Sequence, residues 1–237
     1  MGRGCAAAML IPCIDLQGGR AVQLVHGRRR ELAVDDVFGL LERFRRYRWL
    51  HVIDLDAATG KPANRRLVRE LCRRARRDYG LKVRVGGGIR TVKRAAEAAH
   101  WGAEQIIVGS AAFRGDRVNR SLLGRMRAKL GAKRVVVALD TERGRVVTHG
   151  WRRRSKLRAE AVITELEAYC GGFLCTDVDR EGTMSGANLE WFRALRGATR
   201  HPLIAAGGIR SLREVRALER MGLDAAVGMA IYKNRMS

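Results

Sequence analysis

The chain has 237 residues, of which 46% are hydrophobic and three are proline. This composition excludes a disordered or collagen-like chain, and no uninterrupted apolar run approaches the roughly 20 residues that a membrane-spanning helix needs. The formal net charge is +23, carried mostly by 40 arginines. Because the arginines are spread over every predicted helix, they are typical of solvated helix faces, yet their charge should still draw anions to a site.

Short apolar, β-branched runs alternate along the chain with longer amphipathic stretches. The runs predict strands over 10–15, 50–54, 81–86, 105–109, 134–139, 172–176, 203–206 and 225–228. The amphipathic stretches predict helices near 34–47, 63–78, 91–101, 116–130, 158–169, 188–196 and 211–221. Only residues 230–237 remain for an eighth helix, so the last helix is predicted to be short or absent. The alternation predicts an α/β fold, either a closed (β/α)8 TIM barrel or a doubly wound open sheet.

An internal repeat favours the barrel. Residues 85–91 (VGGGIRT) recur as 205–211 (AAGGIRS), about 120 residues later. Three further segments recur in the same order: 14–16 (IDL) as 139–141 (LDT), 50–56 (LHVIDLD) as 173–179 (FLCTDVD), and 108–111 (VGSA) as 227–230 (VGMA). The pattern predicts two duplicated half-barrels, which an open sheet has no reason to show. We therefore expect one barrel domain over 9–237 with a short N-terminal extension over 1–8.

The glycine-rich turns of the repeat predict two phosphate sites. Each half has a Gly-Gly turn after one strand and a Gly-small turn after the next, and glycine there lets backbone N–H groups close on a phosphate. One predicted site consists of Gly87, Gly88, Gly109 and Ser110, and the other of Gly207, Gly208, Gly228 and Met229. Two sites on opposite sides of one pocket predict a substrate that is phosphorylated at both ends.

Asp15 and Asp140 end the first and fifth predicted strands, which stand opposite each other in such a barrel. A single aspartate at a strand end is often only a cap for the next segment. Here the repeat relates the two aspartates, and both are predicted to face a pocket flanked by phosphate turns. This arrangement favours an acid/base pair, in which one carboxyl donates a proton and the other accepts one.

Four more residues are candidates around this pair. Thr176 ends the sixth predicted strand and Glu181 follows it in a loop, so both could reach the pocket. Asp54 closes the second strand, where a structural hydrogen-bonding role is at least as plausible as a catalytic one. Trp151 lies in the long loop after the fifth strand, where it could stack on a heterocycle of the substrate.

The cysteines and histidines suggest no metal site. His51, His100 and His201 have no partners at ligand spacing. The cysteines are odd in number and contain no C-x-x-C pair, so neither a zinc site nor a disulfide framework is predicted: Cys5, Cys13, Cys72, Cys170 and Cys175. The absence of a disulfide framework favours a reducing cytoplasm.

Several motifs together resemble a known family. They are 11–16 (IPCIDL), 51–56 (HVIDLD), 85–90 (VGGGIR), 150–151 (GW) and 176–183 (TDVDREGT), and the resemblance runs from about Met9 to Arg235. The chain resembles the isomerases of histidine biosynthesis that act on phosphoribosylformimino-5-aminoimidazole carboxamide ribotide. The resemblance implies an Amadori rearrangement of an aminoaldose to an aminoketose, on a substrate with two phosphates and without a metal or cofactor.

The resemblance also implies roles for individual residues. Asp15 matches the position of the family's base, and Asp140 matches that of its proton donor. Glu181 stands where the family often has Asp, and in some relatives that residue is the preferred acid, so Glu181 is the second candidate for the donor.

Three alternatives remain beside this interpretation. The cyclase subunit of imidazole glycerol phosphate synthase shares the duplicated barrel, but it typically has Lys eight residues after its first Asp, where this chain has Gln23. A bifunctional enzyme would also isomerise phosphoribosylanthranilate, which complementation of a tryptophan auxotroph tests. A nucleic-acid-binding protein would need clustered arginines interleaved with aromatics, and aromatics are only 5% here. We therefore expect a small phosphorylated substrate, no nucleic-acid or membrane partner, and a monomer.

Overall fold

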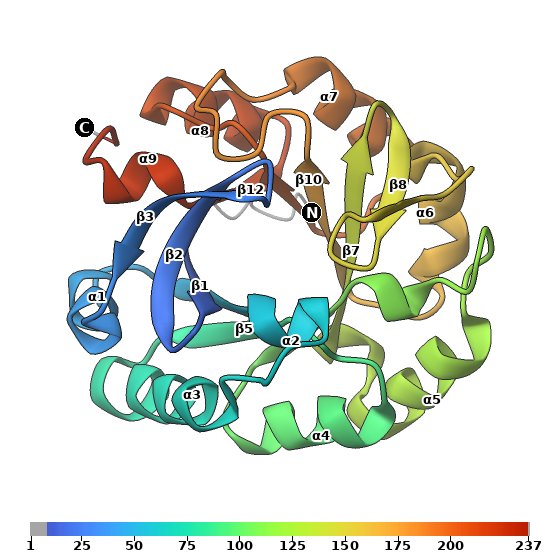
Figure 1. Cartoon of the computed structure of the whole chain (residues 1–237). Helices are drawn as coiled ribbons and strands as arrows, with labels where there is room; N and C mark the ends of the chain where they lie inside the picture. The colour runs from blue at the N-terminus through green and yellow to red at the C-terminus, as the bar shows by residue number, and fades with distance from the viewer. Residues whose placement is uncertain (1–8, 237) are drawn as a thin grey trace, which may run out of the picture.

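The computed structural model describes residues 9–236, in which eight parallel strands form a closed ring (Figure 1). In ring order the strands are β1 (Leu10–Gln17), β4 (Trp49–Asp54), β5 (Lys82–Gly86), β6 (Gln105–Val108), β7 (Val135–Glu142), β10 (Gly172–Asp177), β11 (Leu203–Ala206) and β12 (Leu223–Val227). Strand β7 pairs with β10, and β12 pairs with β1, which closes the ring. The predicted (β/α)8 barrel is confirmed and the open sheet is wrong. The extension predicted for residues 1–8 lies outside the described residues.

The helices cover the outside of the ring (Figure 1). They are α1 (Val37–Arg43), α3 (Arg65–Tyr79), α4 (Val92–His100), α5 (Arg120–Leu130), α6 (Ala159–Glu167), α7 (Leu189–Ala198) and α8 (Leu212–Arg220). Each lies within or overlaps a predicted range, because apolar residues recur every three or four positions and face the sheet, as Val68, Leu71 and Ala75 do in α3. Helix α1 is shorter than predicted because the side chain of Asp36 caps it, accepting the Gly39 N–H at 2.8 Å. Within residues 9–236, no helix combines the length and the apolar character needed to cross a membrane.

Two apolar layers stabilise the barrel. The larger layer lies between the strands and the helices, and a smaller cluster fills the inside of the ring: Ile11, Trp49, Ile107, Val136, Ala138, Leu174, Ile204 and Ala226. Below this cluster, the guanidinium of Arg84 stacks on the Trp49 ring at 3.7 Å and donates to Gln105 Oε1 at 2.5 Å. The filled interior leaves room for a pocket only above it, at the carboxyl ends of the strands.

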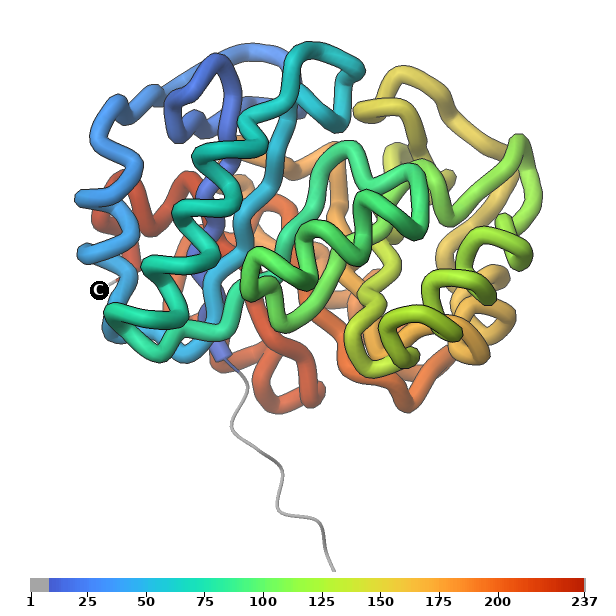
Figure 2. The backbone as a smooth tube through the Cα atoms, turned by 90° about the horizontal axis from the view of Figure 1, so that it is seen from below, coloured from blue at the N-terminus to red at the C-terminus, as the bar shows by residue number. Residues whose placement is uncertain are grey.

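Two hairpins and a short helix were not predicted. They are β2 (Arg20–Val25) with β3 (Arg29–Val34), β8 (Arg145–Thr148) with β9 (Arg153–Arg154), and α2 (Leu55–Thr59). The first strand of each half runs beyond the ring and turns back through two residues with positive φ, Gly18 and Gly19 in one half and Arg143 and Gly144 in the other. The internal repeat therefore includes a hairpin after the first strand of each half, which the sequence comparison of the two halves did not reveal. Both hairpins and α2 lie at the same end of the barrel (Figure 2).

A buried carboxylate ties the second strand of each half to the helix that follows. Asp54 accepts the backbone N–H of Asn64 at 2.8 Å and its side-chain amide at 2.9 Å, and it caps α2 through the Ala57 N–H at 3.0 Å. In the second half, Asp177 accepts the side-chain amide of Asn188 at 3.0 Å. Asp54 therefore has the structural hydrogen-bonding role that its place at a strand end suggested.

The last and first strands meet at a seam covered by α9 (Met229–Tyr232), which confirms that the final helix is short. The seam is held by contacts that α9 makes with β1 and with the end of α1. Arg43 Nη2 donates to the carbonyl oxygen of Ile231 at 2.7 Å, and the rings of Phe44 and Tyr232 meet edge to face with centroids 5.9 Å apart. The Tyr232 hydroxyl donates to the carbonyl oxygen of Cys13 on β1 at 3.0 Å.

Replacing the buried carboxylate of Asp54 should destabilise the barrel. Asp54→Ala leaves the donors of Ala57 and Asn64 without their acceptor, so we expect the free energy of unfolding to fall by about 2–4 kcal/mol in urea titrations. The matched control is Asp78→Ala, which removes an exposed carboxylate paired with Arg77 and should change stability by less than about 0.5 kcal/mol. Equal small losses in both variants would contradict the structural role of Asp54.

Candidate active site

The carboxyl ends of the barrel strands surround a cavity of about 260 Å³. Asp54 does not line this cavity, but every other residue that the sequence predicted for a site does: Asp15, Gly87, Gly88, Gly109, Ser110, Asp140, Trp151, Thr176, Glu181, Gly207, Gly208, Gly228 and Met229. The structure thus brings the glycine turns of both halves and the predicted carboxyls into one pocket, which has the position expected for the active site of such a barrel.

The two Gly-Gly turns have nearly the same backbone. The φ angles are +91° and +66° at Gly87 and Gly88, and +99° and +75° at Gly207 and Gly208. A Cβ on Gly87 would lie 2.1 Å from the carbonyl oxygen of Asp54, and one on Gly207 would lie 2.3 Å from that of Asp177. Both the left-handed conformation and the close backbone approach therefore require glycine.

The second turn of each half also repeats, but the residue after the glycine differs. Gly109 has φ and ψ of −93° and −112°, and Gly228 has −103° and −95°. A helical turn follows directly in both halves, η1 (Ser110–Ala112) and α9. The Ser110 hydroxyl already accepts a backbone N–H from the loop between β8 and β9 at 2.6 Å, whereas Met229 offers no polar side chain. The second turn must therefore rely on its backbone.

Three carboxyl groups share the pocket, and burial dominates their electrostatics. Asp15 lies on β1 beside β4, and burial raises its pKa to about 7. Glu181 lies in the loop after β10, where burial and then the nearby charges of Asp15 and Asp140 raise its pKa to about 8. At neutral pH, Asp15 can accept a proton and Glu181 can donate one.

Asp140 differs from the other two carboxyls because it has hydrogen-bond donors. It lies on β7, directly beside Thr176 on β10, and the indole Nε1–H of Trp151 donates to Asp140 Oδ2 at 2.9 Å. Burial raises the pKa of Asp140, while the hydrogen bonds from Trp151 and Thr176 lower it. The sequence predicted that Trp151 and Asp140 line one site but not that they are bonded, because Trp151 belongs to an unpredicted hairpin.

Several lining residues escaped the sequence analysis. The β2–β3 hairpin contributes Leu24 and Gly27, and α2 contributes Ala58 and Thr59. The Gly18-Gly19 pair between two apolar stretches was the available signal for the hairpin. Across residues 9–236, no group of three or more His, Cys, Asp or Glu side chains is placed to hold a metal ion.

Comparison with known proteins identifies the family. The profile of the histidine biosynthesis protein family matches residues 9–237. A protein of Rubrobacter xylanophilus is 40% identical over 235 residues, which cover 96% of this chain and 92% of the relative. Relatives from Deinococcus radiodurans and Methanocaldococcus jannaschii are 35% and 31% identical, over 96% and 95% of this chain and 94% of each relative. All three are named 1-(5-phosphoribosyl)-5-((5-phosphoribosylamino)methylideneamino) imidazole-4-carboxamide isomerase. This chain belongs to the histidine biosynthesis protein family.

Proposed function

We propose that this protein catalyses the Amadori rearrangement of phosphoribosylformimino-5-aminoimidazole carboxamide ribotide to its phosphoribulosyl form in histidine biosynthesis. The observation that carries the proposal is the repeated pair of glycine turns on two sides of a pocket that contains three carboxyl groups. The name of the relatives describes a substrate with two phosphoribosyl groups, which suits a pocket with two such turns. The reaction moves hydrogen within one molecule, so the proposal includes no redox cofactor.

The glycine turns hold the two phosphates in this proposal. One phosphate binds at Gly87, Gly88, Gly109 and Ser110, and the other at Gly207, Gly208, Gly228 and Met229. Fixing both ends of a long, flexible substrate places its central sugar between the carboxyls. Binding has then already restricted the motion of the substrate, so less entropy is lost on reaching the transition state. Trp151 lines the same pocket and supplies an aromatic face for the imidazole ring.

Asp15 and Asp140 move the protons. Asp140 donates a proton to the ring oxygen of the aminoaldose, and the C1′–O bond breaks to give a Schiff base. Asp15 then removes the proton from C2′, which forms an enolamine that tautomerises to the aminoketose. A pKa of about 7 suits Asp15 as a base at neutral pH. Thr176 supports Asp140 from the neighbouring strand.

Glu181 is the second candidate for the proton donor. Burial, and after it the charges of Asp15, Asp140 and Asp177, raise its pKa to about 8, which keeps it protonated at neutral pH. The proton donor must reach the ring oxygen of the bound substrate. Kinetics of the Asp140 and Glu181 single variants distinguish these two candidates.

The proposal also covers assembly and compartment. The proposed enzyme is a monomer, since the strands of one chain close the ring around the pocket and the proposed roles need no residue of a second copy. Cys13, Cys72, Cys170 and Cys175 are free thiols, which supports a reducing cytoplasm.

Removing the carboxyls one at a time tests these roles. In a histidine auxotroph that lacks the isomerase, Asp15→Asn and Asp140→Asn should fail to restore growth, and Glu181→Gln should restore it poorly. Purified enzymes should show kcat reduced by about 10²–10⁴-fold for the two aspartate variants. The exposed Asp78→Asn is the matched control and should behave like wild type. Growth with both aspartate variants would refute the assignment.

The pH dependence of the wild-type enzyme tests Asp15 as the base. A base works only when it is ionised, so kcat/KM should fall as the pH drops below about 7, the pKa of Asp15. The measurement is kcat/KM between pH 5 and 9 at constant ionic strength. If kcat/KM instead fell only around pH 4, where an exposed carboxyl titrates, the result would contradict the buried Asp15 as the catalytic base.

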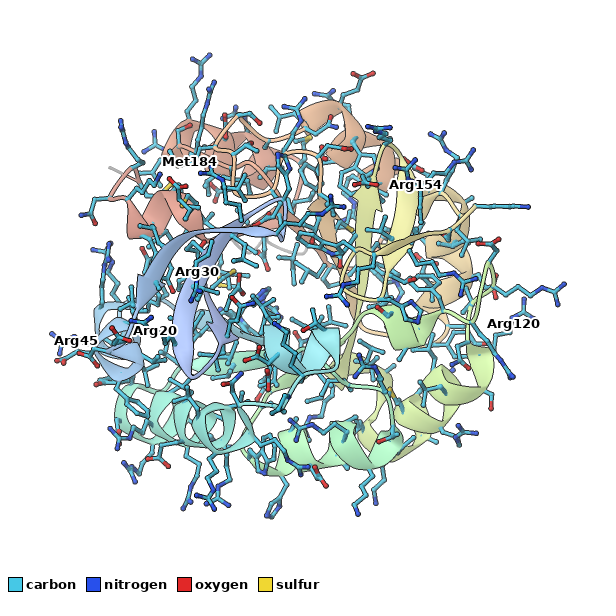
Figure 3. The ribbon with its side chains drawn as sticks, viewed as in Figure 1. Arg20, Arg30, Arg45, Arg120, Arg154 and Met184 are labelled. Carbon is cyan, nitrogen blue, oxygen red and sulfur yellow. The ribbon has the colours of Figure 1, made fainter. Side chains whose placement is uncertain are left out.

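The arginines around the mouth should speed the arrival of a phosphorylated substrate. The two hairpins carry exposed arginine runs at 28–30 and 152–154, and Arg30 and Arg154 lie on either side of the mouth, whereas Arg120 points outward (Figure 3). Replacing Arg28 and Arg30 with Gln should lower kcat/KM about tenfold at low salt and much less at 0.5 M salt.

The control for this experiment removes the same charge elsewhere. Replacing Arg69 and Arg73 with Gln, both exposed on α3, should leave kcat/KM and its salt dependence close to wild type. Equal effects of the two pairs would mean that only the net charge of the protein matters, and not the position of the hairpins.

A further inference from the structure

His26, at the tip of the β2–β3 hairpin, bonds both ends of the turn that carries Glu181. Its backbone N–H donates to the carbonyl oxygen of Glu181 at 2.9 Å, and its ring Nδ1 lies 3.3 Å from the carbonyl oxygen of Val178. The Glu181 N–H donates to the same Val178 oxygen at 3.2 Å, which closes the turn. A carbonyl oxygen can only accept, so the ring donates from a protonated Nδ1. One residue of the hairpin thus holds the turn at its first and last residues.

A close backbone contact reinforces this junction. Gly182 follows Glu181 with a φ of +72°, and a Cβ there would overlap the carbonyl oxygen of Leu24 and lie 2.8 Å from the Cα of Val25. Both the left-handed conformation and the close approach require glycine. The hairpin tip accordingly lies against the loop that follows β10 (Figure 1).

The carboxyl of Glu181 has no anchor of its own. It lines the pocket, and within residues 9–236 no group donates a hydrogen bond to it. The titratable groups around it are Cys13 and Asp15 on β1, Asp140 on β7 and Asp177 at the end of β10. Burial and these acidic neighbours disfavour its ionised form, which would be more stable in water. The carboxyl therefore stays in the pocket only because the backbone beneath it is held there.

The hairpin that holds the turn continues from the strand that carries the proposed base. Strand β2 pairs antiparallel with β1, and Val22 stands directly opposite Asp15. His26 follows at the tip of the same hairpin. The bonds from His26 therefore join Glu181 to the element that also carries Asp15, which fixes the spacing of the two carboxyls.

We propose that His26 is a positioning residue for Glu181: it clamps the turn from Val178 to Glu181 against the β2–β3 hairpin and so keeps the Glu181 carboxyl in the pocket, at a fixed distance from Asp15. His26 is exposed and lies outside the lining of the active-site cavity, so it acts through Glu181 and not on the substrate. This inference rests on the proposed function, because it takes Glu181 as part of the acid/base machinery.

Two substitutions at His26 separate the ring from the backbone. His26 has a left-handed φ of 50°, which glycine adopts freely and asparagine tolerates. His26→Gly keeps the backbone N–H that bonds Glu181 but removes the ring donor. His26→Asn restores a donor, because its amide nitrogen is attached to Cγ as Nδ1 is. A difference between these variants therefore reports the bond to Val178 and not a change in backbone strain.

Nuclear magnetic resonance of the Glu181 carboxyl carbon tests the clamp without any assay of activity. The signal is identified by its loss in Glu181→Gln. Losing one hydrogen bond should make the buried position about threefold to tenfold less favourable, and the ionised carboxyl then reaches water more easily. The pKa of Glu181, about 8 in the wild type, should therefore fall by about half to one pH unit in His26→Gly and stay unchanged in His26→Asn. An unchanged pKa in His26→Gly would overturn the inference.

A double-mutant cycle tests whether His26 acts through Glu181. His26→Gly should lower kcat about threefold to tenfold with KM close to wild type, because the glycine turns that bind the phosphates are intact. In a Glu181→Gln background the same substitution should change kcat less than about twofold, since the group that it positions is gone. A merely structural residue would lower kcat equally in both backgrounds, and that result would overturn the inference. His26→Asn should keep the wild-type kcat, and His100→Asn, at the exposed end of α4, is the unrelated control.

The proposed function can fail separately from this inference. A wild-type protein without isomerase activity would overturn the proposed function, and the titration of Glu181 would still decide whether His26 holds its carboxyl. Full kcat in Glu181→Gln, with the wild type active, would instead overturn the inference, because a residue without a part in the reaction needs no positioning.

Discussion

On two sides of the barrel mouth, the backbone of a turn passes directly over the backbone at the end of the neighbouring strand. Gly87 lies over Asp54 and Gly207 lies over Asp177, with no room for a side chain in either place. The strand ends cannot give way, because the carboxylates of Asp54 and Asp177 are buried and bonded to the helices that follow. The position of both turns, and with it the distance between the two proposed phosphate sites, is thereby fixed by the fold rather than by flexible side chains.

The pocket between these turns has few cations. Of the described residues that line it, Arg90 is the one arginine or lysine, and its guanidinium already donates to the carbonyl oxygens of Ala57 and Ala58. The buried carboxyls therefore lack compensating charge, which keeps the pKa of Asp15 and of Glu181 high. Positive charge lies instead on the hairpins outside, where it can attract an anion without holding the carboxyls ionised.

The barrel, and the carboxyls and glycine turns that line its pocket, could be predicted because both depend on local sequence patterns that the two halves repeat. Asp15 and Asp140 are recognisable as a pair only because each follows the same kind of strand. The hairpins were missed because their short strands lack a clear alternation of apolar and polar residues, and they are held by pairing with β1 and β7. The bond from Trp151 to Asp140 could not be predicted, since it depends on how one hairpin turn meets the other across the mouth.

The seam between β12 and β1 also bears on how the chain folds. Most of the barrel pairs strands that are near neighbours in sequence, but the ring closes only when Tyr232 reaches Cys13 and Arg43 reaches Ile231, which lie 219 and 188 positions apart. Joining such distant segments is slow, because much of the chain must lose its freedom before the contacts form. We expect an open, curved sheet with two unpaired edges to precede the native ring, and that intermediate would be the species most prone to aggregate.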